Sequence, residues 1–162
     1  MALTTAQLQT LRAAILAETD PELVSYRTNG QTGLIAEWYS KPRVPTLTVW
    51  KTRVSNDDIG DAMNGTEVAG LLSLNMQRAQ MLANYSSGYQ NPSRADRRAA
   101  FDQIFSGAGG AITRAALAVL WRRPATRVEA LFATGTGTDA SPATLVFEGA
   151  LSERDVDAAM AL

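Results

Sequence analysis

Helix-breaking residues recur along the chain and limit the length of any helix. Pro21, Pro42 and Pro124 each follow a segment of helical character, and Gly107 follows another. Proline cannot continue a helix through its own position and disfavours the helical conformation of the residue before it, while glycine is common just after a helix end. The sequence therefore predicts a series of short helices separated by turns.

Apolar residues at helical spacing and N-terminal capping residues locate these helices. Thr4 or Thr5 can begin a first helix that ends before Pro21. Thr126 followed by Glu129 has the spacing of a capping box. Ser55, Ser93 and Ser152 are suitable caps for three further helices, and residues 27–33 are predicted to form a turn. In addition to the first helix and the one after Thr126, the predicted helices lie in residues 33–42, 56–63, 66–85, 93–107, 110–124 and 152–162.

Two segments have the character of β structure. Residues 45–55 alternate side chains in the manner of a half-buried strand, and residues 144–147 (Thr-Leu-Val-Phe) are rich in β-branched and aromatic types. The loop before the second segment contains Gly135 and Gly137 but lacks the lysine of a phosphate-binding loop. We predict that residues 134–151 form an arm that leaves the helical body and contacts another subunit. The alternative is a hairpin that folds back on its own body.

These patterns predict a mainly α fold, a compact bundle of short helices with a minor β component that consists of one internal strand and a C-terminal β arm. A length of 162 residues, 46% of them hydrophobic, suits a single domain with its own core. Within it, residues 1–133 are expected to form the helical body, and residues 134–162 the C-terminal arm and terminal helix.

Charge is unevenly distributed along the chain, although the net charge is only −1. Residues 94–127 carry seven arginines and two aspartates, a balance of +5, whereas residues 129–162 carry six acids and one arginine, a balance of −5. Such a distribution can be an ordinary solvated surface. It also suits a subunit whose opposite faces meet head to tail in an assembly.

Two residue types that many enzymes use for catalysis are missing. The chain has no cysteine and no histidine, so thiol nucleophiles, disulfides and imidazole bases are excluded. Lys41 and Lys51 are its only lysines, and neither stands in an S-x-x-K pattern beside a serine. Asp57, Asp58 and Asp61 are explained by the start of a helix better than by a metal. We therefore predict no enzyme activity and no catalytic, cofactor-binding or metal-binding residues.

The sequence has neither a basic leader nor a long apolar run, so we expect a protein made in the cytoplasm and no membrane partner. The arginine-rich segments could contact DNA non-specifically. A dedicated DNA-binding protein is usually basic and richer in lysine, whereas the isoelectric point here is about 5.4. Helical arginines on an acidic protein more often face carboxylates of a protein partner.

Three segments carry a resemblance to a known family: "MALTTAQLQTLRAAILAE", "TVWKTRVSNDDIG" and above all "RRPATRVEALFATGTGTDASPATLVFEGALSERDV". They are similar to small structural proteins of tailed bacteriophages, and the similarity extends from residue 1 to about 156, weakest at 19–45. The resemblance implies a virion protein, a head–tail connector (adaptor or neck) subunit. It also implies a dodecameric ring below the portal, contacts with portal and tail or neck proteins, and no catalytic residues.

Alternatives from other classes are a tail-completion or terminator subunit and a DNA-packaging factor resembling a small terminase, with a helix-turn-helix within residues 93–127. For a connector subunit, the residues expected to contact neighbouring subunits are Arg94, Arg97, Arg98, Arg122, Arg123, Leu145, Val146 and Phe147.

Overall fold

Side-chain caps begin four helices where the sequence predicts them. The computed structural model describes residues 3–84 and 86–162. In each of these helices the cap oxygen accepts an N–H of the first turn, which would otherwise lack a partner. The caps and their helices are Thr4 for α1 (Thr5–Ala17), Ser55 for α4 (Asn56–Ala62), Thr126 for α9 (Arg127–Phe132) and Ser152 for α10 (Glu153–Met160).

The structure departs from the predicted helices in two places. Helix α2 (Pro21–Thr28) begins at a proline that was expected only to end the preceding helix, and it includes the first part of the predicted turn. Proline is well suited to the first position of a helix, and Asp20 caps this one. The helix predicted at 66–85 is two helices, α5 (Gly65–Ala69) and α6 (Ser73–Asn84), because the first ends at Gly70.

The mainly α fold with a minor β component is confirmed. Three more α-helices complete the helical part: α3 (Thr32–Ser40), α7 (Ala95–Ile104) and α8 (Ala111–Leu120), with the 3₁₀ turn η1 (Ala108–Gly110) before α8. Helix α7 begins after Arg94, and the predicted cap Ser93 lies one residue earlier. The strands are short: β1 (Thr48–Trp50), β2 (Val54–Ser55), β3 (Tyr89–Gln90) and β4 (Arg122–Pro124).

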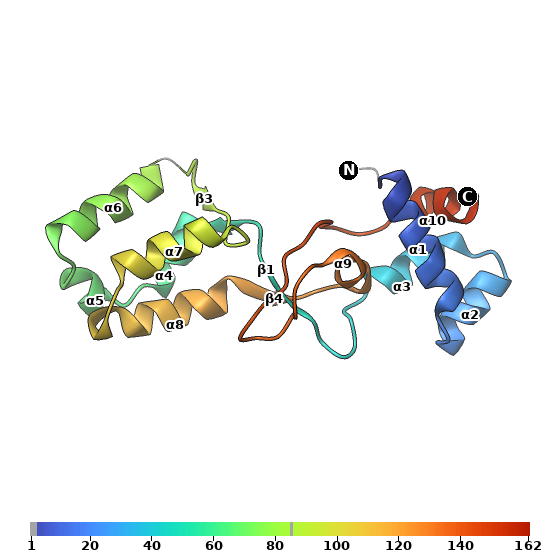
Figure 1. Ribbon diagram of the computed structural model, residues 1–162, viewed down its shortest axis with the longest axis horizontal. Coiled ribbons are helices and arrows are strands. Elements are labelled where there is room, and N and C mark those ends of the chain that lie inside the picture. Colours follow the sequence, from blue (N-terminus) through green and yellow to red (C-terminus); the bar gives the residue numbers. More distant parts are fainter. Residues whose placement is uncertain (1–2, 85) are drawn as a thin grey trace. The chain divides into compact units, whose positions relative to one another are not determined.

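The chain divides into two compact units, labelled by their elements in Figure 1. Unit 1 contains residues 1–49 and 124–162, and unit 2 contains residues 50–123. The chain passes between the units in β1 and in β4, which pair with each other. This division does not coincide with the boundary expected at 133/134, because the C-terminal residues belong with the N-terminal helices.

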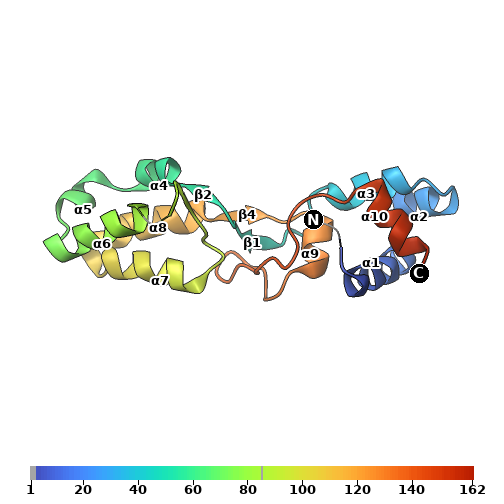
Figure 2. The same ribbon diagram turned by 90° about the horizontal axis from the view of Figure 1, so that it is seen from above.

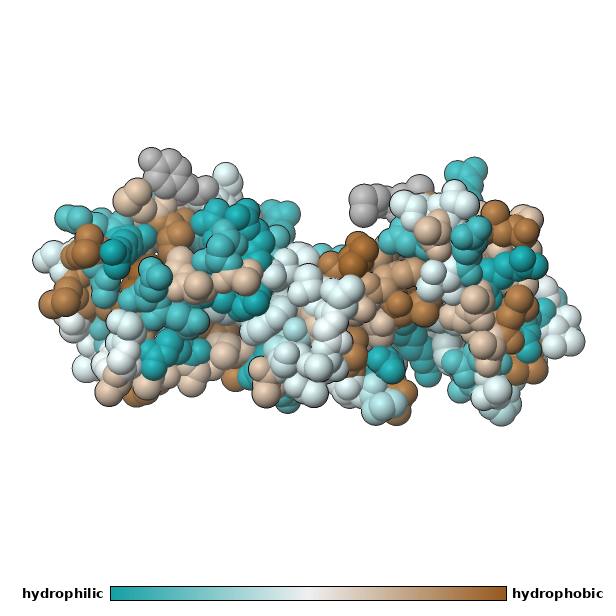
Figure 3. Space-filling model, viewed as in Figure 1, coloured by the Kyte–Doolittle hydropathy of each residue, from teal (hydrophilic) through white to brown (hydrophobic). Residues whose placement is uncertain are grey.

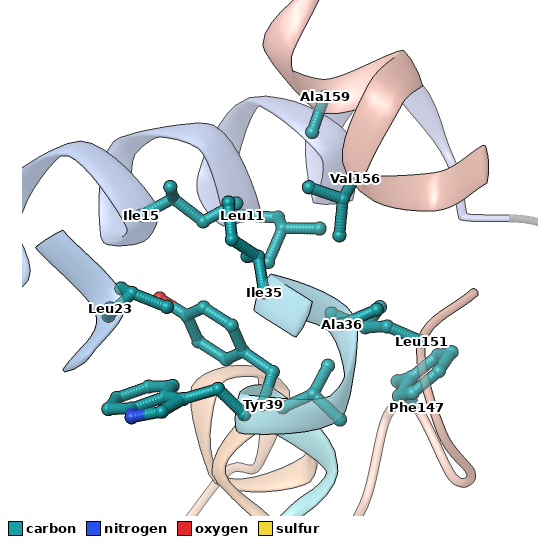
Figure 4. Close-up of a cluster of buried hydrophobic side chains, with 12 residues drawn as sticks. Leu11, Ile15, Leu23, Ile35, Ala36, Tyr39, Phe147, Leu151, Val156 and Ala159 are labelled. Carbon is teal, nitrogen blue, oxygen red and sulfur yellow. The ribbon is translucent and has the colours of Figure 1, made fainter. Parts of the chain in front are cut away.

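The core of unit 1 lies among α1, α3 and α10. Leu11 and Ile15 of α1 and Val156 of α10 are fully buried, and Figure 4 shows them on the side of their helices that faces Ile35 of α3. These positions follow the helical spacing of the sequence. Tyr39 is also part of this core, and burial raises the pKa of its hydroxyl to about 12.

The core of unit 2 lies between α4, α7 and α8. Phe101 of α7 packs edge-to-face on Trp121, with ring centroids 5.3 Å apart, and Ile59 and Leu117 fill the space beside them. Strands β2 and β3 pair antiparallel next to this core. Helix α6 lies alongside α7 (Figure 2).

Residues 134–151 fold back on unit 1. Thr134 and Thr144 pair in an antiparallel bridge, and the N–H of Ala143 donates to the carbonyl of Thr48 at 2.9 Å. The Thr48 hydroxyl donates to Asp139 at 2.6 Å. The side chain of Phe147 lies in the unit 1 core. The expected free arm is thus replaced by a segment held on its own body, and the strand expected at 144–147 is limited to isolated bridges at Ala143 and Thr144.

Candidate interaction surfaces

The five predicted contact arginines do not form one surface. Arg94 is exposed and pairs with Asp96 at 2.6 Å in the first turn of α7. Arg97 is half-buried beside it. Arg122 and Arg123 lie in β4, both half-buried and both engaged in interactions within the chain.

Arg98 is directed into its own unit. Its Nη1 donates to the carbonyls of Pro92 and Ser93, and its guanidinium lies over the ring of Trp50, 4.1 Å from the ring centre. Partial burial lowers the pKa of this guanidinium. Arg98 therefore holds the start of α7 in place, and no sequence pattern distinguishes it from Arg94 and Arg97.

A groove with a cationic rim runs between α6 and α7. Its volume is about 340 Å³, and its apolar lining includes Leu82 and Ile104. Arg78 of α6 and Arg97 of α7 line it from the two helices. Neither arginine is engaged with a carboxylate by an ion pair within the part of the chain that the structure describes.

The outer side of α6 continues this surface with exposed apolar side chains. Leu74 is 57% exposed and Met81 56% exposed, and they flank Arg78 at helical spacing. No described residue of α6 is fully buried. Figure 3 shows hydrophobic surface where α5 and α6 meet, a region whose exposed residues include Leu72 and Leu74. We call Leu74, Arg78, Met81 and Arg97 the basic face.

Unit 1 has a groove of opposite charge between α3 and α10. Its volume is about 630 Å³, and its lining includes the exposed carboxylates of Glu37 and Glu153. The remaining lining residues, apart from Lys41, are small or apolar: Gly33, Ala36, Ser40, Ala150 and Leu151. The ammonium group of Lys41 pairs with Glu22 at 3.0 Å, so the two carboxylates determine the charge of the groove. We call it the acidic groove.

A second groove of unit 1, of about 520 Å³, contains an aromatic and cationic pair. The guanidinium of Arg127 lies 3.7 Å from the centre of the Trp38 ring and donates to the Trp38 carbonyl at 3.0 Å. Both of these interactions of Arg127 are with Trp38 of its own unit. The arrangement fixes α9 against α3.

The three predicted contact residues of the C-terminal segment have different environments. Val146 is 58% exposed and Leu145 is half-buried. Phe147 is only 6% exposed and packs edge-to-face on Phe132, with ring centroids 5.8 Å apart. The side chain of Phe147 is therefore occupied within its own unit, and Val146 is the one of the three that a neighbour could reach.

The division into units sharpens the uneven charge of the sequence. Unit 2 contains nine lysine and arginine residues and six acids, a net charge of +3. Unit 1 contains six basic residues and ten acids, a net charge of −4. Opposite charge on two compact units attracts unlike surfaces of separate copies.

Within residues 3–84 and 86–162, no group of three or more acidic side chains is placed to hold a metal ion. Asp58 instead belongs to the start of α4, where its N–H and carboxylate both bind the Ser55 hydroxyl. No single helix in these ranges is long and apolar enough to cross a membrane, and only the bent pair formed by residues 95–104 and 108–120 meets that criterion, by length and composition.

Comparison with protein family models found no matching family, and comparisons with curated proteins and with solved structures found no similar protein.

Proposed function

We propose that this chain is a structural subunit of a tailed-bacteriophage virion, part of the head–tail connector ring that joins the portal to the tail, and that it has no catalytic activity. The observation that carries the proposal is the opposite net charge of the two units, +3 and −4. A subunit that repeats around a ring needs two different surfaces that fit each other. The resemblance of three sequence segments to small virion proteins supports the same role.

The terminase-like alternative requires basic side chains that are available to phosphate groups. Two arginines of the α7–α8 region are used internally instead. Arg98 binds the carbonyls before α7, and Arg114 donates to the carbonyls of Phe105 and Gly107. This use favours the structural role over DNA recognition, although the net charge of unit 2 is compatible with non-specific contact with the genome.

The test is the composition of purified virions and the position of the chain in them. We expect the chain in intact particles, in ring density between portal and tail when the neck is reconstructed by electron microscopy. Density in the tail terminator would favour the tail-completion alternative. Absence from particles, together with a shift of duplex DNA in a gel at moderate salt, would overturn the proposal in favour of a packaging factor.

A further inference from the structure

We propose that the basic face of unit 2 docks into the acidic groove of unit 1 of a second copy of this chain. The inference rests on the proposed role as an assembly subunit, and it names the two surfaces through which successive copies meet. In this contact Arg78 and Arg97 face Glu37 and Glu153, and Leu74 and Met81 cover the small and apolar lining of the groove.

The basic face leaves apolar side chains exposed that its own unit does not cover. A helix in water derives most of its stability from burying one side, yet α6 has exposed apolar side chains and no fully buried described residue. Its inner side is only half-buried, through Ala79 and Leu82. A partner that covers Leu74 and Met81 would remove apolar surface from water.

The acidic groove has the chemistry and the space to be that partner. Guanidinium groups pair with carboxylates through two parallel hydrogen bonds, and both Glu37 and Glu153 are exposed. Small residues along the groove leave room for long side chains. The Glu153 carboxyl lies beside Gly33, where an added Cβ would be in ordinary van der Waals contact with the carboxyl carbon at 3.8 Å.

Charge complementarity identifies the occupant as another copy of the chain. The face belongs to the unit of charge +3 and the groove to the unit of charge −4, and every copy carries both. The contact joins unlike surfaces, so each added copy uses one of its two surfaces and leaves the other free for the next copy. Such contacts build rings or open chains rather than closed two-fold dimers.

The experiment uses two charge-reversed forms of the full chain. One carries Arg78→Glu and Arg97→Glu, and the other carries Glu37→Arg and Glu153→Arg. The wild type is expected to form oligomers as its concentration rises, measured by light scattering after size exclusion. Each variant alone is expected to have a dissociation constant raised at least about tenfold, because like charges then face each other.

Mixing the two variants is the decisive step. Where the two variants meet, the face and the groove carry opposite charges whichever variant supplies the face, so oligomers in which the variants alternate are expected to return. A misfolded variant could not restore assembly in its partner. The control carries Lys51→Glu and Arg53→Glu, which change the charge of unit 2 equally at residues that do not line the groove between α6 and α7, and it is expected to assemble like the wild type.

Three results would overturn the contact: a wild type that stays monomeric up to about 1 mM, a bound that corresponds to very weak association; a control pair as damaging as the basic-face pair; or a mixture that stays monomeric. A chain found in virions but failing these measurements sinks the contact alone. A chain that passes them but is absent from virions keeps the contact and loses the proposed function.

Discussion

Glu67 of α5 caps the N-terminus of α8 at Thr113, 46 residues further along the chain: Oε2 of Glu67 accepts the N–H of Thr113 at 2.7 Å. Its other oxygen, Oε1, accepts the N–H of Ile112 at 3.0 Å. The hydroxyl of Thr113, which is fully buried, accepts the N–H of Asn64 at 3.0 Å. A carboxylate from another helix thus supplies the cap that Gly110, at the start of α8, has no side chain to provide.

This cap predicts that unit 2 loses stability in acid. Partial burial raises the pKa of Glu67, but the hydrogen bonds from Thr113 and Ile112 and the nearby charge of Arg114 together outweigh it and hold the pKa below its ordinary value of 4.5. The carboxylate therefore contributes stability that is present above pH 4.5 and is lost as the pH falls through the lowered pKa. Glu67→Gln should lower the denaturant concentration at the midpoint of unfolding at pH 7. It should also reduce the difference between the midpoints measured at pH 7 and at pH 4.

Asp61→Asn is the matched control, because Asp61 is an exposed carboxylate of the neighbouring α4. It should keep both the midpoint and the acid sensitivity of the wild type. If the Glu67 and Asp61 variants respond to pH alike, Glu67 does not act as the cap of α8.

Two adjacent residues of the C-terminal segment are expected to respond differently to substitution by alanine. Phe147→Ala should destabilise unit 1 by about 3–5 kcal/mol, because it empties a buried site against Phe132. Val146→Ala should change stability by less than about 0.5 kcal/mol, because Val146 is exposed. Hydrogen exchange read by peptide would show the loss in α1 and α10 for the first variant only. A free arm would give small effects for both.

The same packing changes the expectation for a larger deletion. Gly149 donates its N–H to the buried carboxylate of Glu129 at 3.3 Å, which ties the segment to the capping box of α9. Removing residues 134–148 would take Phe147 from the core. We therefore expect a destabilised unit 1 from this deletion and not the intact helical body that a free arm would leave.

Local signals were predictable from the sequence, and the capped helices show why. The oxygens of Thr4, Ser55, Thr126 and Ser152 bind an N–H three residues ahead, so the pattern is complete within a few letters. The prediction that Pro21 only ends the preceding helix was wrong, because helix α2 begins there. A proline can end one helix or begin the next, and only Asp20 before it distinguished the two.

The division into units and the two candidate surfaces could not be predicted in this way. Both depend on contacts between segments far apart in the sequence, such as Glu153 of α10 beside Gly33 of α3. The arginines illustrate the same limit, because Arg94 and Arg98 look alike as letters. Only the position of Trp50 and of the carbonyls before α7 gives them different environments.

The space around two glycines indicates whether substitution by alanine stabilises or destabilises unit 2. A Cβ at Gly110 would overlap the backbone of Phe105, so Gly110→Ala should destabilise unit 2 by about 1–3 kcal/mol or more. Gly60 lies inside α4 with nothing near its added Cβ, and alanine favours a helix over glycine by about 1 kcal/mol. Gly60→Ala should therefore stabilise the same unit, as thermal unfolding would show. Equal effects of the two substitutions would contradict the close approach at Gly110.

Arg98 and Arg94 predict a contrast between an internal and an exposed arginine. Arg98→Lys should destabilise unit 2 by about 1–2 kcal/mol, because an ammonium group cannot lie flat on Trp50 and also reach both carbonyls. Arg94→Lys should change stability by less than about 0.5 kcal/mol, since its pair with Asp96 is exposed. Denaturant unfolding followed by tryptophan fluorescence measures both. If Arg98→Lys leaves the stability unchanged but weakens self-association, Arg98 faces a neighbouring subunit after all, and its assignment to the start of α7 is wrong.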